Sequence, residues 1–232
     1  MPLFQIKCEK RKGNFSPEEI YSIFLKKIKQ ISSNYLGKEV KDALITVPCH
    51  FNLFQRKSIE NAGKIADLNI LRIITDSTSA SLYYTFKNNQ SIAEKKILIF
   101  DLGGSSFNVA LANIEDGLSE ILVNEGIVNL GGENFNNRLI EYCAKEYEKK
   151  TSIDISSSPT YFGKLRLLCE KAKIALSSDN QTTIEIYDIF SGEKVKISIT
   201  REIFENICKD LFEKCIKHLK SYSKMQKWTK MK

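Results

Sequence analysis

Short apolar runs alternate with amphipathic segments between residues 43 and 87, and this alternation restricts the fold more than any other feature of the sequence. Residues 43–47 form an apolar run that ends at Pro48, and residues 70–74 form a second one, each typical of a buried strand. A segment with helical spacing follows each run. Strand, helix, strand, helix in this order predicts a mainly parallel α/β unit.

Capping residues mark where the helices should begin. Ser16 precedes Pro17 and stands three residues before Glu19, which is the capping-box pattern, and helical spacing of apolar residues continues to about residue 36. The other predicted starts are Asn52 with Gln55 for a helix to about Asp67, Asp76 for a short helix, and Thr200 for a last helix that runs into the C-terminal segment.

The clearest strand, residues 96–102, carries a carboxylate at its end, Asp101, and is followed by Gly103 and Gly104. Residues 107–112 return as a second strand, which predicts a hairpin with a tip of small residues. Glycines let backbone N–H groups approach phosphate oxygens, and an aspartate can hold Mg²⁺. The segment therefore suits a metal–phosphate site, although a plain glycine-rich hairpin explains it equally well.

A second glycine pair, Gly131-Gly132, opens a predicted helix over residues 133–149. A helix N-terminus suits phosphate, but an ordinary tight entry to an amphipathic helix is the simpler interpretation of this pair alone. The remaining expected elements are a strand over 120–128, a loop around 156–159, a helix over 161–176 and a β pair over 182–199 turned at Ser191-Gly192.

Composition and charge exclude several classes of protein. The chain has 232 residues, 42% hydrophobic and 27% charged, which is ordinary for a globular protein, and no apolar run approaches the length of a membrane span. No secretory signal is visible at the N-terminus. Seven of the 35 basic residues lie between Lys214 and Lys232, a stretch without Asp or Glu, so the tail accounts for the net charge of +7. The neutral remainder argues against nucleic-acid binding.

The lysine-rich tail has two interpretations. It could form an amphipathic helix that touches an acidic membrane or a partner, with Trp228 among the lysines, or it could be a solvated helix end, which is the more common outcome. The six cysteines form no CxxC pair and the two histidines are far apart, which argues against a zinc site. Reduced thiols in the cytoplasm are therefore expected.

Six segments match one family in order and spacing. They are ALITVP at 43–48, AGKIADLNILRII at 62–74, IFDLGG at 99–104, LGGENFNNRL at 130–139, CEKAK at 169–173 and SITR at 198–201. The sequence resembles the ATPase domain of the seventy-kilodalton heat-shock chaperones, within the actin-like ATPase superfamily, from about Phe15 to about His218. The resemblance implies a partial actin-like α/β fold with mixed sheets and flanking helices in two lobes. Residues 1–114 would hold the partial first lobe and the start of the second, residues 115–220 the rest of the second, and residues 221–232 a disordered basic tail.

The same resemblance implies a site for ATP or ADP with Mg²⁺. Asp101 would be the metal ligand and, with Ser106 and Asp76, would belong to the catalytic group. The residues expected to contact the nucleotide are Gly103, Gly104, Ser105, Gly131 and Gly132 near the phosphates, and Glu170, Lys173 and Ser177 near the adenosine. Pro48 and Arg56 match the pair that relays the nucleotide state to the substrate-binding domain.

The chain departs from the family pattern inside this site. Ser105 and Ser106 stand where the family has a third glycine and a threonine; Ser106 keeps a hydroxyl, whereas Ser105 adds a β-carbon close to the phosphates. The other departures are Asn108 for a carboxylate of the cation site, Asp76-Ser77 for a Glu-Pro pair, and Ile174 for an arginine that stacks on adenine.

Other parts of the family's machinery match no segment of this sequence. The first phosphate hairpin and the catalytic lysine would precede the first residue, and the second adenosine loop, the linker and the peptide-binding domain would follow the last. Phosphoryl transfer depends on positioned charges, and losing one such group typically costs about 10²–10³ in rate. We therefore expect inefficient ATP hydrolysis by this chain alone, and unpaired strand edges that lower its solubility.

Three functional hypotheses remain open from the sequence. The first is a chaperone-type ATP-binding domain in an incomplete chain, which would work with co-chaperones and nucleotide-exchange factors and reach unfolded clients only through a domain not contained here. The second is a degenerate module of the same fold that binds partner proteins without turnover. The third, a small-molecule kinase of the superfamily, is disfavoured by the long chaperone-type segments.

Overall fold

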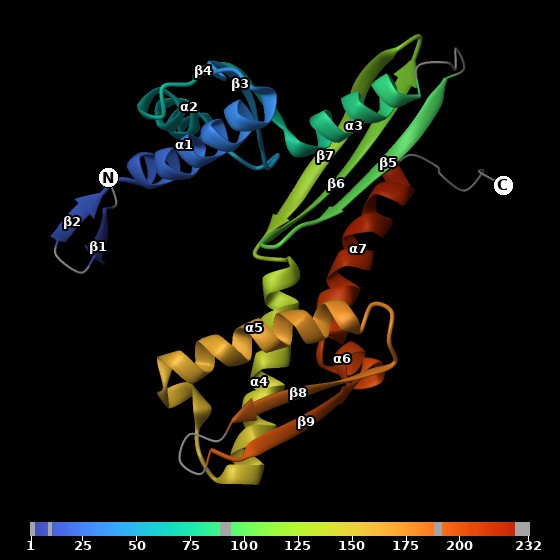
Figure 1. The fold of residues 1–232 in the computed structure, drawn as a ribbon. Helices are drawn as coiled ribbons and strands as arrows, with labels where there is room; N and C mark the ends of the chain where they lie inside the picture. Colours follow the sequence, from blue (N-terminus) through green and yellow to red (C-terminus); the bar gives the residue numbers. More distant parts are fainter. Residues whose placement is uncertain (1–2, 9–10, 89–93, 188–191, 226–232) are drawn as a thin grey trace. The chain divides into compact units, whose positions relative to one another are not determined.

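The structure is a computed structural model that describes residues 3–8, 11–88, 94–187 and 192–225. The chain divides into two compact units (Figure 1). The first comprises Met1–Asp101 with Asn108–Gly126, and the second comprises Leu102–Phe107 with Ile127–Lys232. The lobe boundary at residue 114 that was expected from the sequence stays a prediction.

The first unit contains the predicted strand–helix alternation. Its elements are β1 (Phe4–Cys8), β2 (Arg11–Phe15), α1 (Pro17–Leu36), β3 (Asp42–Val47), α2 (Leu53–Ile65), β4 (Asn69–Thr75) and α3 (Asp76–Lys87). Strands β3 and β4 pair in parallel, which confirms the α/β unit, while β1 and β2 form an antiparallel pair that the sequence analysis did not anticipate. Leu25 of α1 packs with Ala62 of α2 and with Ala66 and Leu68, which follow α2 in the chain.

Local capping explains where these helices begin. The Ser16 hydroxyl accepts from the Glu19 N–H at 3.2 Å while the Glu19 carboxylate accepts from the Ser16 N–H at 2.8 Å, and Asn52 makes the same exchange with Gln55. Both predicted capping boxes are confirmed. The prediction for Asp76 is wrong: Thr75 caps α3, because its hydroxyl accepts from the Thr78 N–H and Asp76 is already the first helical residue.

Three long strands form a sheet in the order β5-β6-β7. They are β5 (Lys95–Leu102), β6 (Ser106–Glu115) and β7 (Leu118–Val128). Connections this short allow only antiparallel neighbours, so the predicted hairpin with its tip at residues 103–105 is confirmed. Residues 107–112 of β6 are buried, which makes this strand the apolar centre of the sheet.

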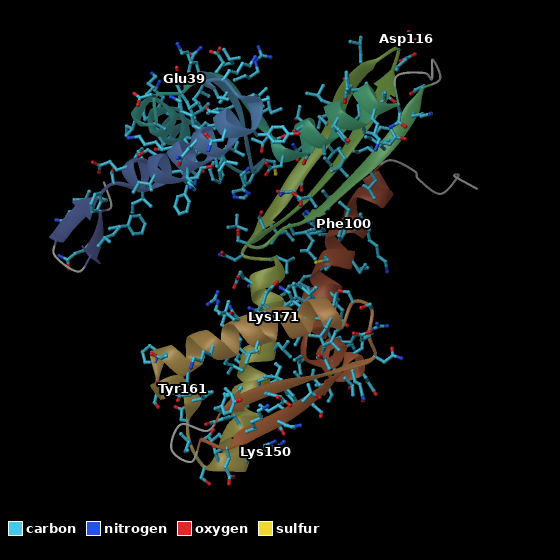
Figure 2. The ribbon with its side chains drawn as sticks, viewed as in Figure 1. Glu39, Phe100, Asp116, Lys150, Tyr161 and Lys171 are labelled. Carbon is cyan, nitrogen blue, oxygen red and sulfur yellow. The ribbon has the colours of Figure 1, made fainter. Side chains whose placement is uncertain are left out.

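The second unit packs two long helices against a β pair (Figure 1). Its elements are α4 (Gly132–Thr151), the 3₁₀ turn η1 (Ile155–Ser157), α5 (Pro159–Ala175), β8 (Gln181–Tyr187), β9 (Lys194–Thr200), α6 (Arg201–Ile207) and α7 (Lys209–Met225). Its core contains Leu139, Tyr147, Leu165 and Ile197, each fully buried. Lys150, labelled in Figure 2, donates to the backbone carbonyl of Lys196 and so ties the end of α4 to β9.

Several expectations are corrected in this unit. Strands β8 and β9 are antiparallel as predicted, but Ser191 of the predicted turn lies outside the described residues. The expected loop at 156–159 contains the turn η1. The single last helix is broken into α6 and α7 at Cys208, whose buried thiol points to the Phe135 carbonyl. Helix α7 reaches Met225, so residues 221–225 are helical rather than disordered.

The apolar stripe of α1 faces outward. Ser22 and Leu25 are the buried residues of this helix, whereas Phe24, Ile28 and Ile31 each expose more than half of their area. The helical spacing was predicted correctly, but it does not reveal which stripe is covered. Across the described part of the chain, no helix combines the length and the apolar character that crossing a bilayer requires.

Candidate functional site

The two glycine pairs of the second unit lie against each other. The carbonyl of Gly103 accepts from the Gly132 N–H at 2.8 Å, and the carbonyl of Gly104 accepts from the Glu133 N–H at 2.8 Å. The Gly131 N–H donates to the Asn134 side chain at 2.9 Å. These bonds place the hairpin tip on the N-terminus of α4. The N–H groups of Gly131, Gly132 and Glu133, which were expected to be free to bind phosphate, therefore already have acceptors. What remains at the N-terminus of α4 to attract an anion is the positive end of the helix dipole.

Glycine is required at Gly131 for packing. A Cβ built there would lie 2.6 Å from the carbonyl carbon and oxygen of Gly104 and 2.6 Å from the Ser105 nitrogen, all of them backbone atoms. A Cβ at Gly104, in contrast, would meet no atom within 4 Å. One glycine therefore lets the two loops touch, and the other leaves open space at the hairpin tip.

A cavity of about 210 Å³ opens where the tip, α4 and α5 meet. Its lining residues are Gly104, Gly132, Glu133, Asn136, Arg166, Leu167, Glu170 and Lys173. The Lys173 ammonium lies 2.6 Å from the Glu170 carboxylate and 3.1 Å from the Gly132 carbonyl oxygen, and Arg166 pairs with Glu133. The two cations that line this cavity are each paired with a carboxylate that also lines it, so an anionic ligand would compete with Glu133 and Glu170 for Arg166 and Lys173.

Asn136 adds an unsatisfied polar atom to this cavity. Its side chain is 1% exposed, and its Oδ1 has no hydrogen-bond partner within the described residues. A buried acceptor without a donor costs free energy, and such atoms usually bind water or a ligand. Asn136 therefore marks a place where a donor from outside the protein would be stabilising.

Asp101 belongs to the first unit, where Asn108 holds its carboxylate. The Asn108 Nδ2 donates to Asp101 Oδ2 at 3.3 Å, and the Cys49 thiol donates to Asn108 Oδ1 at 3.5 Å. Burial raises the pKa of Cys49, and the negative charges of Asp76 and Glu125 raise it further. The predicted residues Asp101 and Asp76 thus lie around a protonated thiol that the sequence analysis did not single out.

Ser77, for which the resemblance implies a proline in the family, is hydrogen-bonded to the long sheet. Its hydroxyl donates to Asn124 Oδ1 at 3.1 Å, and the Asn124 Nδ2 donates to the Thr75 hydroxyl at 2.9 Å. Ser77 is buried. Two side-chain hydrogen bonds therefore hold the N-terminus of α3 to β7, and a proline at position 77 could not make the one from Ser77.

Pro48 and Arg56, the predicted relay pair, meet at one residue. The Pro48 carbonyl accepts from the Phe51 N–H at 3.1 Å, and the Arg56 Nε donates to the Phe51 carbonyl at 2.9 Å. The structure therefore brings the two residues together through the backbone between β3 and α2. A relay role for this pair stays a prediction.

Comparison with known proteins decides the family. A family model described as "Hsp70 protein" matches residues 2–230. The chain belongs to the Hsp70 family. It is 43% identical over 216 residues to heat shock cognate 70 kDa protein 3 of Dictyostelium discoideum. These matched residues cover 93% of this chain and 34% of that protein.

Two further relatives give the same picture. The chain is 42% identical over 211 residues to a heat shock 70 kDa protein of Neurospora crassa, covering 91% of this chain and 32% of that one. It is 42% identical over 212 residues to a ribosome-associated molecular chaperone of Eremothecium gossypii, covering 91% and 35%. This Hsp70-family chain therefore has the actin-like ATPase fold and spans about a third of the length of the curated relatives it matches.

Some predicted contact residues lie apart from the cavity of this Hsp70-family chain. Ser177, a predicted contact residue, is exposed just beyond the end of α5 and is not among the lining residues. Ile174, which the resemblance places where the family has an arginine, is 62% exposed and does not line the cavity either. Ser105 is exposed at the hairpin tip and Ser106 begins β6. Within the second unit, the structure thus brings together Gly104, Gly132, Glu170 and Lys173, but not Ser177.

The residues that line the cavity of the second unit fit part of a nucleotide. Open space at Gly104, the cations Arg166 and Lys173, and the unsatisfied Asn136 oxygen suit an anionic ligand with polar hydrogens. Within the described residues, no cluster of three or more His, Cys, Asp or Glu is placed to hold a metal ion. Mg²⁺ is commonly held by one or two carboxylates together with ligand phosphates, so the single carboxylate of Asp101, in the first unit, is compatible with Mg²⁺ as a ligand.

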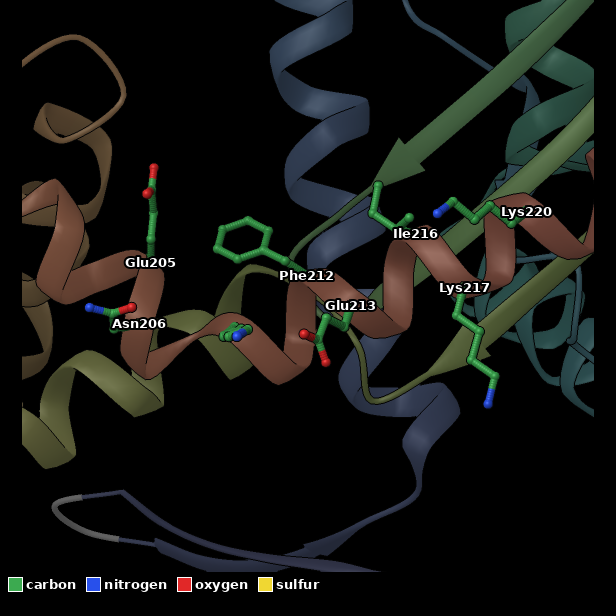
Figure 3. Close-up of a pocket in the computed structure, with 8 residues that line it drawn as sticks. Glu205, Asn206, Phe212, Glu213, Ile216, Lys217 and Lys220 are labelled. Carbon is green, nitrogen blue, oxygen red and sulfur yellow. The ribbon is translucent and has the colours of Figure 1, made fainter.

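A larger hollow lies elsewhere on the second unit. It measures about 1000 Å³ and runs along α6 and α7, where Phe212 and Ile216 lie between lysines (Figure 3). None of its lining residues is a predicted site residue, and it lacks the glycine-lined backbone of the smaller cavity. Size alone therefore does not locate the site.

Sequence reasoning missed Arg166, Asn136 and Cys49. Arg166 lies four residues before Glu170 and seven before Lys173, so helical spacing puts all three on one face of α5. Asn136 likewise stands one turn after Gly132 on α4. These spacings were available as signals, whereas nothing in the sequence pairs Cys49 with Asn108.

Proposed function

We propose that this chain forms part of the ATP-binding domain of an Hsp70-type molecular chaperone and binds ATP or ADP with Mg²⁺. The observation that carries the proposal is the cavity between the two glycine pairs and α5, with Lys173 and Arg166 beside it. Family membership supports the same conclusion.

The proposal gives each predicted residue a role. Asp101 would hold Mg²⁺, and the backbones of Gly103, Gly104 and Ser105 would lie along the phosphates, with Gly131 and Gly132 opposite. Glu170, Lys173 and Ser177 would contact the adenosine, while Ser106 and Asp76 would orient water. Because Lys173 is already paired with Glu170, binding would exchange part of that ion pair for the ligand.

Thermal unfolding with and without nucleotide tests this function. A ligand present at a hundred times its Kd and bound only to the folded state should raise the Tm of a chain of this size by about 5–10 °C. Lys173→Gln should reduce the rise, whereas Lys171→Gln, a change at an exposed lysine of the same helix, should not. No rise with Mg·ATP or Mg·ADP beyond that with Mg²⁺ alone would contradict the proposal.

The second candidate is a module of the same fold that binds partner proteins without hydrolysing ATP. The hydrogen bonds of Ser77 to Asn124 and of Asn108 to Asp101 favour it, because both residues replace groups of the family's site with neutral donors. Phosphate release at saturating Mg·ATP separates the two candidates. Binding without release supports the module, and release above the uncatalysed rate supports the ATPase.

Partners and location follow as proposals from the family. Co-chaperones and nucleotide-exchange factors would bind this chain, and unfolded clients would be reached only through a further domain. We place the protein in the cytoplasm. The cysteines that the structure describes as free, Cys49, Cys143, Cys169, Cys208 and Cys215, are consistent with a reducing compartment. Cell fractionation would test the location.

A further inference from the structure

Three side chains of the first unit form a hydrogen-bonded series that ends at Asp101. The Cys49 thiol donates to Asn108 Oδ1 at 3.5 Å, and Asn108 Nδ2 donates to Asp101 Oδ2 at 3.3 Å. Asn108 is 1% exposed, so water cannot replace either partner without an opening of the structure. Cys49 is partly exposed, whereas the other cysteines that the structure describes as free, Cys143, Cys169, Cys208 and Cys215, are buried.

The Cys49 thiol favours the same orientation of the Asn108 amide as the Asp101 carboxylate does. A carboxamide presents an acceptor on one side and two donors on the other, and its orientation follows from the partners of each. Because the thiol proton is donated to Oδ1, the NH₂ group faces Asp101. An amide turned over would bring its oxygen against the carboxylate, which is unfavourable.

The surroundings keep the thiol a donor. Burial and the charges of Asp76 and Glu125 raise the pKa of Cys49, so at neutral pH it carries its proton. The Asp101 carboxylate is the group at the other end of the series, and Asn108 lies between the two. The residues around Cys49 are therefore suited to hold a neutral thiol rather than a reactive thiolate.

We propose that Cys49 is a positioning residue for the cation site at Asp101: it fixes the amide of Asn108, which in turn holds Oδ2 of Asp101 and leaves the other oxygen for Mg²⁺. The inference rests on the proposed function for its ligand, but the orientation of the amide can be tested without any ligand. The thiol acts through Asn108 and does not touch the nucleotide.

Two substitutions separate hydrogen bonding from volume. Cys49→Ala removes the hydrogen-bond donor and reduces the volume of the side chain. Cys49→Ser also reduces the volume, but its hydroxyl remains a donor. Cys215→Ala, the loss of a buried thiol of the second unit, serves as the control. Far-UV circular dichroism and Tm would confirm that the full-length variants fold.

The first measurement needs no nucleotide. In ¹⁵N-labelled protein, the side-chain amide hydrogens of Asn108 should exchange with solvent about three- to tenfold faster in Cys49→Ala than in the original chain, because one hydrogen bond that orders them is lost. Cys49→Ser and Cys215→Ala should leave the exchange rate close to that of the original chain. Equal acceleration in the alanine and serine variants would mean that cysteine acts by volume, and would overturn the proposal.

The second measurement is the affinity for Mg²⁺ in the presence of ADP, with Mg²⁺ alone as the reference. Cys49→Ala should weaken it about three- to tenfold, and Cys49→Ser should restore most of the loss. In an Asn108→Leu background, Cys49→Ala should have no further effect, because the thiol then has no amide to orient. An additional loss in that background would refute action through Asn108.

The two measurements fail independently. If the original chain binds no Mg·ADP, the proposed function is wrong, while the exchange rate still decides the role of Cys49. If Mg·ADP binds and neither the exchange rate nor the affinity changes in Cys49→Ala, the positioning role is wrong and the proposed function stands.

Discussion

Replacing Gly131 or Gly104 by alanine should show separately how each glycine contributes to the stability of the fold and to nucleotide binding. The two glycines lie close together in space, and each substitution adds one methyl group. In Gly131→Ala the new Cβ would lie 2.6 Å from backbone atoms of Gly104 and Ser105, which cannot rotate away as a side chain can. The backbone of Gly131 is extended, so the substitution adds no strain in φ and its cost comes from packing alone.

The expected cost follows from what must move. Relief requires the hairpin tip to withdraw from α4, which lengthens the hydrogen bonds from Gly132 N–H to Gly103 and from Glu133 N–H to Gly104, each now 2.8 Å. Overpacking of this kind destabilises by about 1–3 kcal/mol. In Gly104→Ala the Cβ meets no atom within 4 Å, so stability should be unchanged or rise by up to about 1 kcal/mol.

Urea unfolding followed by circular dichroism at 222 nm measures both free energies of unfolding, and thermal shift with Mg·ADP measures binding. Gly104→Ala should keep its stability and lose nucleotide-dependent stabilisation, because the methyl group occupies the open space at the cavity. Gly131→Ala should lose about 2–4 °C of Tm per kcal/mol. If the two variants are equally stable to within about 0.5 kcal/mol, the close approach at Gly131 does not constrain the fold.

Three further outcomes are expected. Asn52→Ala removes the cap of α2 and should cost about 1 kcal/mol in urea unfolding; an unchanged midpoint would contradict the capping box. Burial raises the pKa of Cys208 to about 12. Because the unfolded thiol ionises near 8.5, the contribution of Cys208 to the free energy of unfolding should be complete below about pH 8 and fall by up to about 1.4 kcal/mol per pH unit above it. Cys208→Ala should lessen the fall without abolishing it, because the pKa values of Cys49, Cys169 and Cys215 are raised as well. Phe24→Lys with Ile28→Lys should reduce self-association in light scattering, since both side chains are exposed on α1; unchanged scattering would show that the stripe is not adhesive.

The first residue of a helix could be predicted where hydrogen bonds between the N-cap residue and the residue three positions later decide it. Ser16 with Glu19 and Asn52 with Gln55 are such cases, since each box closes within four residues. The N-cap of α3 was predicted wrongly because two residues that can cap a helix, Thr75 and Asp76, stand side by side. The sequence does not show which of them is the cap; in the structure it is Thr75, whose hydroxyl accepts from the Thr78 N–H.

Distant contacts account for the other errors. The last helix breaks at Cys208, whose side chain is fully buried with its thiol on the Phe135 carbonyl, 73 residues earlier. Neither the period of apolar residues nor a local breaker signals that contact. The exposed stripe of α1 is a similar case, because helical spacing shows that a face exists and not what lies against it.

For the candidate site, the resemblance predicted the residue types and the fold supplied their partners. Gly104, Gly132, Glu170 and Lys173 were expected, and they do line one cavity. That Gly131 must be glycine because of Gly104, and that the N–H groups of Gly132 and Glu133 are already bonded, could not be foreseen. The roles of these residues toward a nucleotide stay predictions.

By itself, the sequence determined the alternation of strands and helices, the family and the small residues at the hairpin tip. These depend on hydrophobic period, capping and chain order, which act over a few residues. Only the tertiary structure decided which donors meet which acceptors: Cys49 with Asn108, Arg166 with Glu133, and the two glycine pairs with each other. Such contacts join residues far apart in the chain. They follow from how whole elements pack, and one sequence read along its length does not contain that information.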